Sequence, residues 1–174
     1  MSKLLFLFLG TIIWYETSVY TLSAPAAGGG TISFSQYEGK KILLVNIATG
    51  SARVSQLTAL EQLYQQHIDS MVVIGFPSNS FGNEPLSGTE LESVLRNTYN
   101  ITFPLADKII TTGDSAHAVY KWLASKEENG VTKSRMRGDF QKYLLNSQGK
   151  IVGIFDTATS PLSDRIQTAI QINH

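Results

Sequence analysis

Two continuous apolar runs mark the centre of the predicted fold. Residues 42–47 (ILLVNI) and 71–76 (MVVIGF) are apolar at nearly every position, which is typical of strands buried on both faces. Between them, residues 51–68 have apolar side chains at the spacing of one helical face. A strand, a helix and a strand in this order predict a βαβ unit in which the two strands are parallel.

Shorter segments predict the rest of the sheet and its covering helices. The remaining strands are expected at residues 19–22, 31–34, 143–145 and 150–155. Helices are expected at residues 89–98, 116–125 and 161–172, with Ser87 as an N-cap of the first. Residues 126–138 have poor periodicity and are expected to form a loop. The order predicts an α/β domain with a central mixed sheet flanked by helices and an N-terminal β-hairpin.

The first residues of the chain form a short apolar segment. Residues 4–14 follow Lys3 and are mostly apolar, but a bilayer crossing takes ~20 residues. Residues 1–16 therefore resemble a secretory signal or an uncleaved anchor, which would export the protein or associate it with a membrane through residues 4–14. A buried N-terminal strand or a misread start in a cytoplasmic protein stays open. Residues 17–174 are expected to form the folded domain.

Composition excludes several classes of function. Lys plus Arg and Asp plus Glu both number 14, so the net charge is zero, which removes the electrostatic case for nucleic-acid binding. Cysteine is absent from all 174 residues. This absence excludes disulfides, thiolate zinc sites, iron–sulfur clusters and thiol catalysis. No residue cluster has metal-ligand spacing, and no cofactor is expected.

Five short motifs occur in order along the chain. The two longest are residues 39–49 (GKKILLVNIAT) and 76–85 (FPSNSFGNEP), and the others are residues 101–105 (ITFPL), 117–123 (HAVYKWL) and 157–161 (TATSP). Together they resemble the glutathione peroxidase family, whose fold is thioredoxin-like and whose second signature reads Phe-Pro-Cys-Asn-Gln-Phe-Gly-x-x-Glu-Pro. The short stretch before residue 140 resembles the compact, usually monomeric subgroup, whose electron donor is often thioredoxin.

The resemblance implies an activity, namely thiol-dependent reduction of hydroperoxides in the response to oxidative stress, with glutathione or thioredoxin as donor. The family uses a Cys or selenocysteine supported by a Gln, a Trp and an Asn. These four positions fall on Ser51, Ser80, Gly138 and Asp139. The positions at which the family can place further cysteines fall on Ser78 and near Leu95.

The substitution at position 51 alters the chemistry most. A serine hydroxyl is protonated near neutral pH, and oxygen lacks the reversible two-electron oxidation that sulfur undergoes. Three hypotheses follow: a non-catalytic binding module, a retained peroxide- or thiol-linked oxidoreductase, and a hydrolase that uses Ser51. The hydrolase would need a general base from His67, His117 or His174. The first hypothesis is favoured because all four positions depart from the pattern together.

Other polar residues are expected to have structural or solvated roles. Asn46 lies within a predicted buried strand and is expected to have its hydrogen bonds satisfied. Glu84 and Asp139 are expected to be separate solvated carboxylates. The cations of residues 133–137 flank the former cleft and are expected to form a solvated basic loop, with binding of an anion as the alternative.

Overall fold

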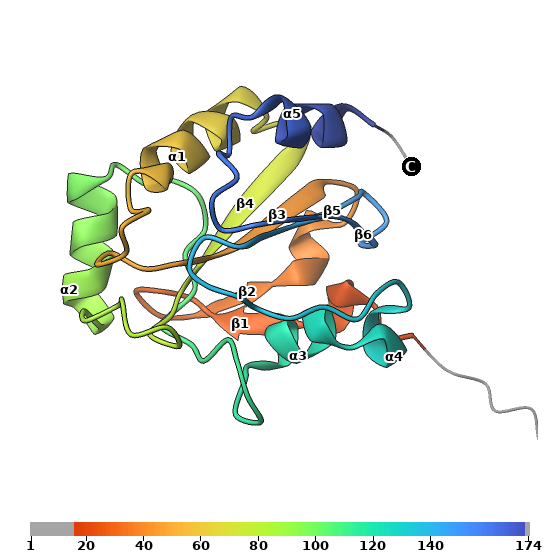
Figure 1. Ribbon diagram of the computed structural model, residues 1–174, viewed down its shortest axis with the longest axis horizontal. Helices are drawn as coiled ribbons and strands as arrows, with labels where there is room; N and C mark the ends of the chain where they lie inside the picture. The colour runs from red at the N-terminus through yellow and green to blue at the C-terminus, as the bar shows by residue number, and fades with distance from the viewer. Residues whose placement is uncertain (1–15, 173–174) are drawn as a thin grey trace, which may run out of the picture.

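The computed structural model describes residues 16–172 and is built on a four-stranded sheet (Figure 1). Its strands, in the spatial order β4-β3-β5-β6, are β3 (Lys41–Ile47), β4 (Met71–Pro77), β5 (Lys142–Leu145) and β6 (Ile151–Phe155). β3 is parallel to β4 and antiparallel to β5, which is in turn antiparallel to β6. The predicted βαβ unit and the predicted mixed sheet are both confirmed.

Helices cover both faces of this sheet. The helices are α1 (Gln56–Gln66), α2 (Gly88–Ser93), α3 (Ala118–Ala124), α4 (Lys126–Asn129) and α5 (Asp164–Gln171), and a π-helical turn over Val94–Thr98 continues α2. In Figure 1, α1 and α5 lie on one side of the sheet, and α3 lies on the other side with a separate hairpin. This hairpin consists of β1 (Ser23–Pro25) and β2 (Thr31–Ser33).

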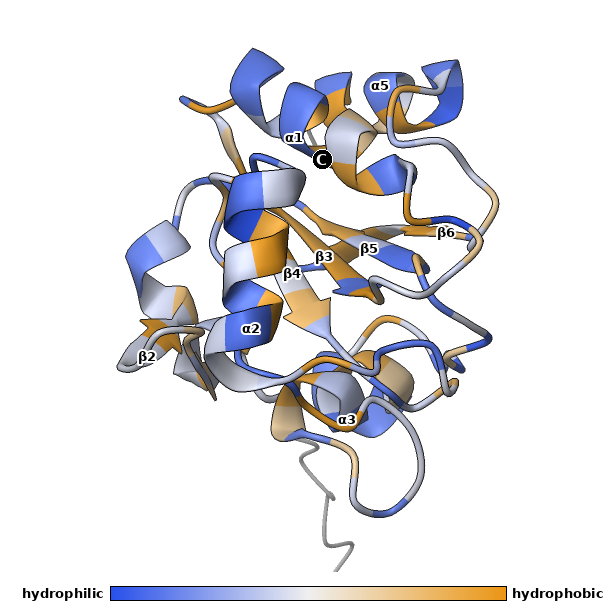
Figure 2. Cartoon of the chain, turned by 90° about the vertical axis from the view of Figure 1, so that its left-hand side faces the viewer, coloured by the Kyte–Doolittle hydropathy of each residue, from blue (hydrophilic) through white to orange (hydrophobic). Residues whose placement is uncertain are grey.

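The side chains of β3 alternate between the two layers of the core. Ile42 and Leu44 pack in the cluster that contains Trp122 of α3. Leu43 and Val45 pack in the cluster that contains the apolar faces of α1 and α5. Alternation with period two is what strand geometry imposes, and Figure 2 shows the central strands as apolar ribbons between helices with mixed faces. A strand with two covered faces explains why its sequence is apolar throughout.

The structure corrects several predicted boundaries. Val19–Thr21 forms a 3-10 turn rather than a strand, and the first strand of the hairpin begins at Ser23. α1 begins at Gln56 rather than at residue 51, because residues 51–55 form successive turns. Within the predicted loop over residues 126–138, α4 forms one helical turn. A four-residue helix is too short to show a periodic apolar pattern in the sequence. Its capping residues, Ser125 and Gly130, stabilise it instead.

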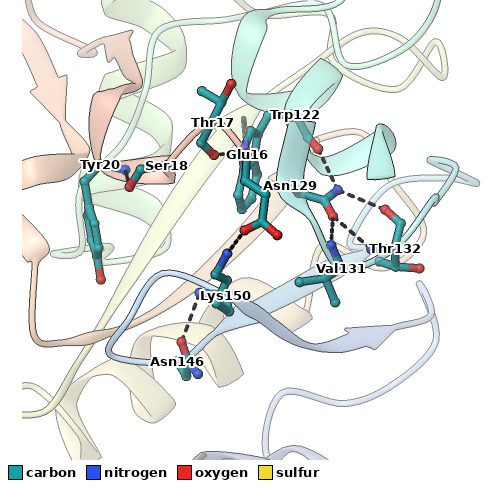
Figure 3. A network of polar contacts seen from close by, with 10 residues as sticks. All are labelled: Glu16, Thr17, Ser18, Tyr20, Trp122, Asn129, Val131, Thr132, Asn146 and Lys150. Carbon is teal, nitrogen blue, oxygen red and sulfur yellow. Dashed lines mark hydrogen bonds and ion pairs between the residues drawn. The ribbon is translucent and has the colours of Figure 1, made fainter. Parts of the chain in front are cut away.

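The first described residues are bound to the body of the domain (Figure 3). The Trp122 indole donates to the Thr17 carbonyl at 2.7 Å, and the Thr17 amide donates to the Glu128 carbonyl at 2.8 Å. Glu16 forms an ion pair with Lys150. The apolar segment that precedes Glu16 lies outside the described residues, so its role as signal or anchor stays a prediction. Within residues 16–172, none of the helices has the length and apolar composition that a membrane crossing requires.

Candidate functional site

The four candidate positions lie at one edge of the sheet. Ser51 follows β3 and Ser80 follows β4, and these strands are parallel, so their carboxyl ends meet at the same edge. Gly138 and Asp139 precede β5, which is antiparallel to β3, so they lie at this edge too. In open α/β sheets this edge is the usual position of a binding site.

Ser51 lies in the turn that connects β3 to α1. Its side chain is buried, and its hydroxyl oxygen accepts a hydrogen bond from the Arg53 amide at 3.3 Å. The Gly50 amide donates to the Asn83 carbonyl at 2.9 Å, and a Cβ at Gly50 would lie 2.7 Å from that carbonyl oxygen. The close approach requires glycine and holds the Ser51 turn against the loop after β4.

Asp139 is connected to the same turn through Asn83. The Asn83 side-chain amide donates to Asp139 Oδ2 at 2.7 Å. Asp139 Oδ1 is buried and has no hydrogen-bond partner among the described residues. Asp139 is buried, and Asn83 of the loop after β4 bonds it, so the expectation of a solvated carboxylate at Asp139 is wrong.

Asn46 holds the segment that contains Gly138 and Asp139. Its side-chain amide donates to the Gly138 carbonyl at 3.2 Å, and its own carbonyl accepts from the Phe140 amide at 2.8 Å. Phe140 has a φ of +63°, a left-handed conformation that a bulky residue rarely adopts. Asn46 Oδ1 is buried without a hydrogen-bond partner in the described structure. We expected both ends of this side-chain amide to be hydrogen-bonded, and only the nitrogen is.

Ser80 belongs to a different hydrogen-bond network. The Ser78 hydroxyl donates to Ser80 Oγ at 3.0 Å, and the Thr111 amide donates to the same oxygen at 2.9 Å. In the part of the chain that the structure describes, no hydrogen bond joins Ser51 or Ser80 to Asp139. The structure thus joins Asp139 through Asn83 to Gly50, the residue before Ser51, and places Ser80 against Thr111.

Glu84 forms a structural clamp rather than a solvated carboxylate. It is fully buried, and its two carboxylate oxygens accept from the Thr49 amide and the Thr49 hydroxyl, each at 2.7 Å. One of the oxygens also accepts from the Leu86 amide at 3.1 Å. Among residues 16–172, no group of three or more His, Asp or Glu side chains is arranged to hold a metal ion.

Sequence reasoning missed Lys142, which lies behind this edge of the sheet. Its side chain is fully buried, and its ammonium group donates to the carbonyls of Phe140 and Thr159 at 2.7 and 2.8 Å. Burial lowers the pKa of Lys142 to about 7, and the charge of Arg53 acts in the same direction. The signal in the sequence that could have found Lys142 was a charged residue at the start of an otherwise apolar strand, β5.

The basic segment is exposed, as the expectation of a solvated loop requires, and Leu95 and Ser78 are buried. The basic residues of the 133–137 segment, namely Lys133, Arg135 and Arg137, are exposed. Leu95, near which the family can place a further cysteine, is buried in the core beside α2. The Ser78 amide donates to the Ile47 carbonyl at 3.1 Å, which ties the end of β4 to the end of β3.

Comparison with known proteins identifies the family. The glutathione peroxidase family model matches residues 19–124. A glutathione peroxidase-like peroxiredoxin of Saccharomyces cerevisiae is 35% identical over 149 residues, which cover 84% of this chain and 92% of that protein. A glutathione peroxidase of Lactococcus lactis is 33% identical, with 82% of this chain and 91% of that protein covered.

Solved structures agree with this assignment. The crystal structure of apo Trgpx has a TM-score of 0.68 and 32% identity, and the match covers 90% of this chain and 97% of that one. A thioredoxin family thiol:disulfide interchange protein of Chlorobium tepidum is similar in fold alone, with a TM-score of 0.62 and 17% identity. The fold is therefore thioredoxin-like, and the chain belongs to the glutathione peroxidase family.

Proposed function

We propose that this chain does not reduce hydroperoxides and serves as a non-catalytic binding module on the family scaffold. The observation that supports this proposal most strongly is the absence of cysteine from all 174 residues, with Ser51 at the position of the peroxidatic residue. Peroxide reduction by this family passes an oxygen to a sulfur or selenium anion, and a thiol then reduces the product. A serine oxygen provides neither the anion near neutral pH nor the reversible oxidation.

The surroundings of Ser51 support the same conclusion. Asp139 has a buried carboxyl at the position where the family resemblance places an amide donor, and Gly138 has no side chain at the position where the resemblance places an indole. The hydroxyl of Ser80 is engaged with Ser78 and Thr111. A carboxylate disfavours a second anion nearby, so the cleft no longer provides the donors that a thiolate or a peroxide needs.

The alternative functions lack supporting contacts. A hydrolase would need a histidine against Ser51, yet His67 Nε2 contacts Gln167 and His117 Nδ1 accepts from the Val119 amide. His174 lies outside the described residues. Oxidation of Met136 would consume the side chain stoichiometrically, without a catalytic cycle.

The proposal is tested by measuring hydroperoxide consumption by the purified chain, with glutathione as the reductant and separately with thioredoxin and its reductase. We expect no turnover above the protein-free rate. In Ser51→Cys we expect slow but repeated turnover, because the thiolate would accept a hydrogen bond from the Arg53 amide, as the serine oxygen does, but would lack the other donors of the family. Ser70→Cys is the matched control, since it places an exposed thiol immediately before β4, at the opposite edge of the sheet.

The possible results test the loss of peroxidase activity and the assignment of position 51 separately. Turnover by the native chain would refute the proposal directly. Equal turnover in Ser51→Cys and Ser70→Cys would show that a thiol at either position suffices, and the absence of turnover in both would likewise remove the assignment of position 51. Turnover confined to Ser51→Cys would place the former peroxidatic position there.

A further inference from the structure

A hollow beside Ser80 lies between α3 and the segment before β5, and Thr111, whose amide donates to Ser80 Oγ, contributes to its lining. It has a volume of about 360 Å³, which is at the lower end of the range for small-ligand sites, ~300–1,000 Å³. Part of its lining is apolar, namely Phe81, Ala116, Tyr120, Ala124 and Met136, and the rest is polar or charged, with Thr111, Ser134 and Arg135 among it. We call it the α3 hollow. A second hollow of about 360 Å³ shares Phe81, Arg135 and Met136 and extends to Arg137.

The apolar part of the α3 hollow is firmly packed against the core. The ring of Tyr120 lies edge-on against Phe76 of the core, with 5.5 Å between the ring centroids. Met136 is almost completely buried, and Phe81 is half-buried. A methionine adapts its shape to irregular apolar groups, and an aromatic ring provides a flat contact surface. These walls suit a compact apolar group.

The charge around the hollow has one sign. Lys121, Arg135 and Arg137 line the two connected hollows, and no carboxylate does. The chain as a whole is neutral, so this excess of cations is local. The one ion pair found within residues 16–172 joins Glu16 to Lys150, and no hydrogen bond involves the side chains of these three cations there. They are therefore available to an anion.

We propose that the α3 hollow binds an organic anion with a compact apolar body, whose carboxylate or phosphate group lies against Lys121 and Arg135. The apolar walls bury the body, while the guanidinium of Arg135 matches either headgroup through paired hydrogen bonds. Neither Ser51 nor Asp139 lines the hollow. Binding is thus independent of the proposed loss of peroxidase activity, and either proposal can fail without the other.

Isothermal titration calorimetry on the native chain tests the ligand class. Octanoate and hexyl phosphate are the two anionic probes, octanamide is the neutral counterpart, and acetate has the charge without the apolar body. We expect saturable one-to-one binding of at least one anionic probe, with an affinity about tenfold or more above that of octanamide and acetate. The tighter of the two probes identifies the headgroup. Equal affinity for octanamide, or no saturable binding by either anion, would overturn the proposal.

Variants locate the binding. Lys121→Gln combined with Arg135→Gln is expected to weaken the anionic probe about tenfold, whereas Lys133→Gln removes a cation of the same loop that does not line the hollow. Ala124→Leu fills the hollow without a change of charge and is expected to weaken binding as well. Lys121, Lys133 and Arg135 are exposed, so their substitution by Gln leaves the core intact. An equal loss of affinity in Lys133→Gln would contradict the site.

Discussion

At the scale of single residues, Lys142 is a charged group placed inside the sheet without a carboxylate partner. Its ammonium group has two carbonyl acceptors, and no ion pair within residues 16–172 includes it. Burial of a cation without a counter-ion disfavours the protonated form. The cost of this burial is a property of the folded state alone, since the unfolded chain hydrates the same group.

This arrangement predicts how stability depends on pH. The pKa of Lys142 is about 7 in the folded chain against 10.5 for an ordinary lysine. Between these values the unfolded chain binds the additional proton, so the contribution of Lys142 to stability decreases as the pH falls from about 10.5 to about 7 and is constant below that.

Comparison of the native chain with Lys142→Met isolates the pH-dependent contribution of Lys142 to the free energy of unfolding. The methionine variant leaves two carbonyls unpaired at every pH, so its overall stability is not the readout. The readout is the difference in unfolding free energy between the two proteins, which we expect to shift by on the order of 3 kcal/mol between pH 7 and pH 9.5. Urea unfolding at several pH values measures it. A difference that does not vary with pH would contradict the assignment.

Asp139 provides a second prediction at the residue scale. Its carboxylate is joined to the Ser51 turn through Asn83 and Gly50, so it disfavours an anion at position 51. In the Ser51→Cys background, Asp139→Asn is expected to lower the thiol pKa and to increase the rate of peroxide reduction, because it removes a neighbouring negative charge. Thiolate absorbance as a function of pH measures the former. A thiol pKa that is unchanged would show that Asp139 does not act on this position.

At the scale of elements, the helix caps differ although the residue type is the same. The Ser125 hydroxyl oxygen accepts from the Glu128 amide at the start of α4, at 3.2 Å. Ser87 has the N-cap position of α2, as the sequence predicts, but its side chain makes no capping hydrogen bond. A serine therefore stabilises a helix end only where the local backbone brings an amide to its oxygen.

The two serines form a matched pair for measurement. Ser125→Ala is expected to reduce the unfolding free energy by about 1 kcal/mol, and Ser87→Ala by less than about 0.5 kcal/mol. Thermal and urea unfolding monitored by circular dichroism report both values. Equal effects of the two substitutions would mean that the hydrogen bond at Ser125 does not contribute to stability.

At the scale of the whole molecule, the sheet separates two apolar layers, and the loops of the candidate site lie at the carboxyl ends of β3 and β4. Thr49 and Glu84 are 35 residues apart, yet their hydrogen bonds join the end of β3 to the loop after β4. Gly50 and Asn83 form a second connection beside the first. The candidate site is thus held by loop contacts across the edge, which explains why buried polar residues concentrate there rather than in either layer.

The amino-acid sequence by itself determined the parts of this protein that neighbouring residues encode. The apolar runs of β3 and β4 predicted parallel strands, the helical spacing between them predicted α1, and five ordered motifs predicted the family. The absence of cysteine limited the chemistry without any reference to shape. Periodicity is a local property, so these features could be recognised from short segments.

Only the tertiary structure decided which polar groups are buried. The sequence predicted solvated carboxylates at Glu84 and Asp139, and it offered no reason to single out Lys142, yet all three side chains are buried. Their burial comes from segments that are distant along the chain, as when Lys142 donates to the Thr159 carbonyl. The α3 hollow likewise forms where separate loops meet a helix. Burial depends on what covers a residue, and folding alone brings the covering segments together.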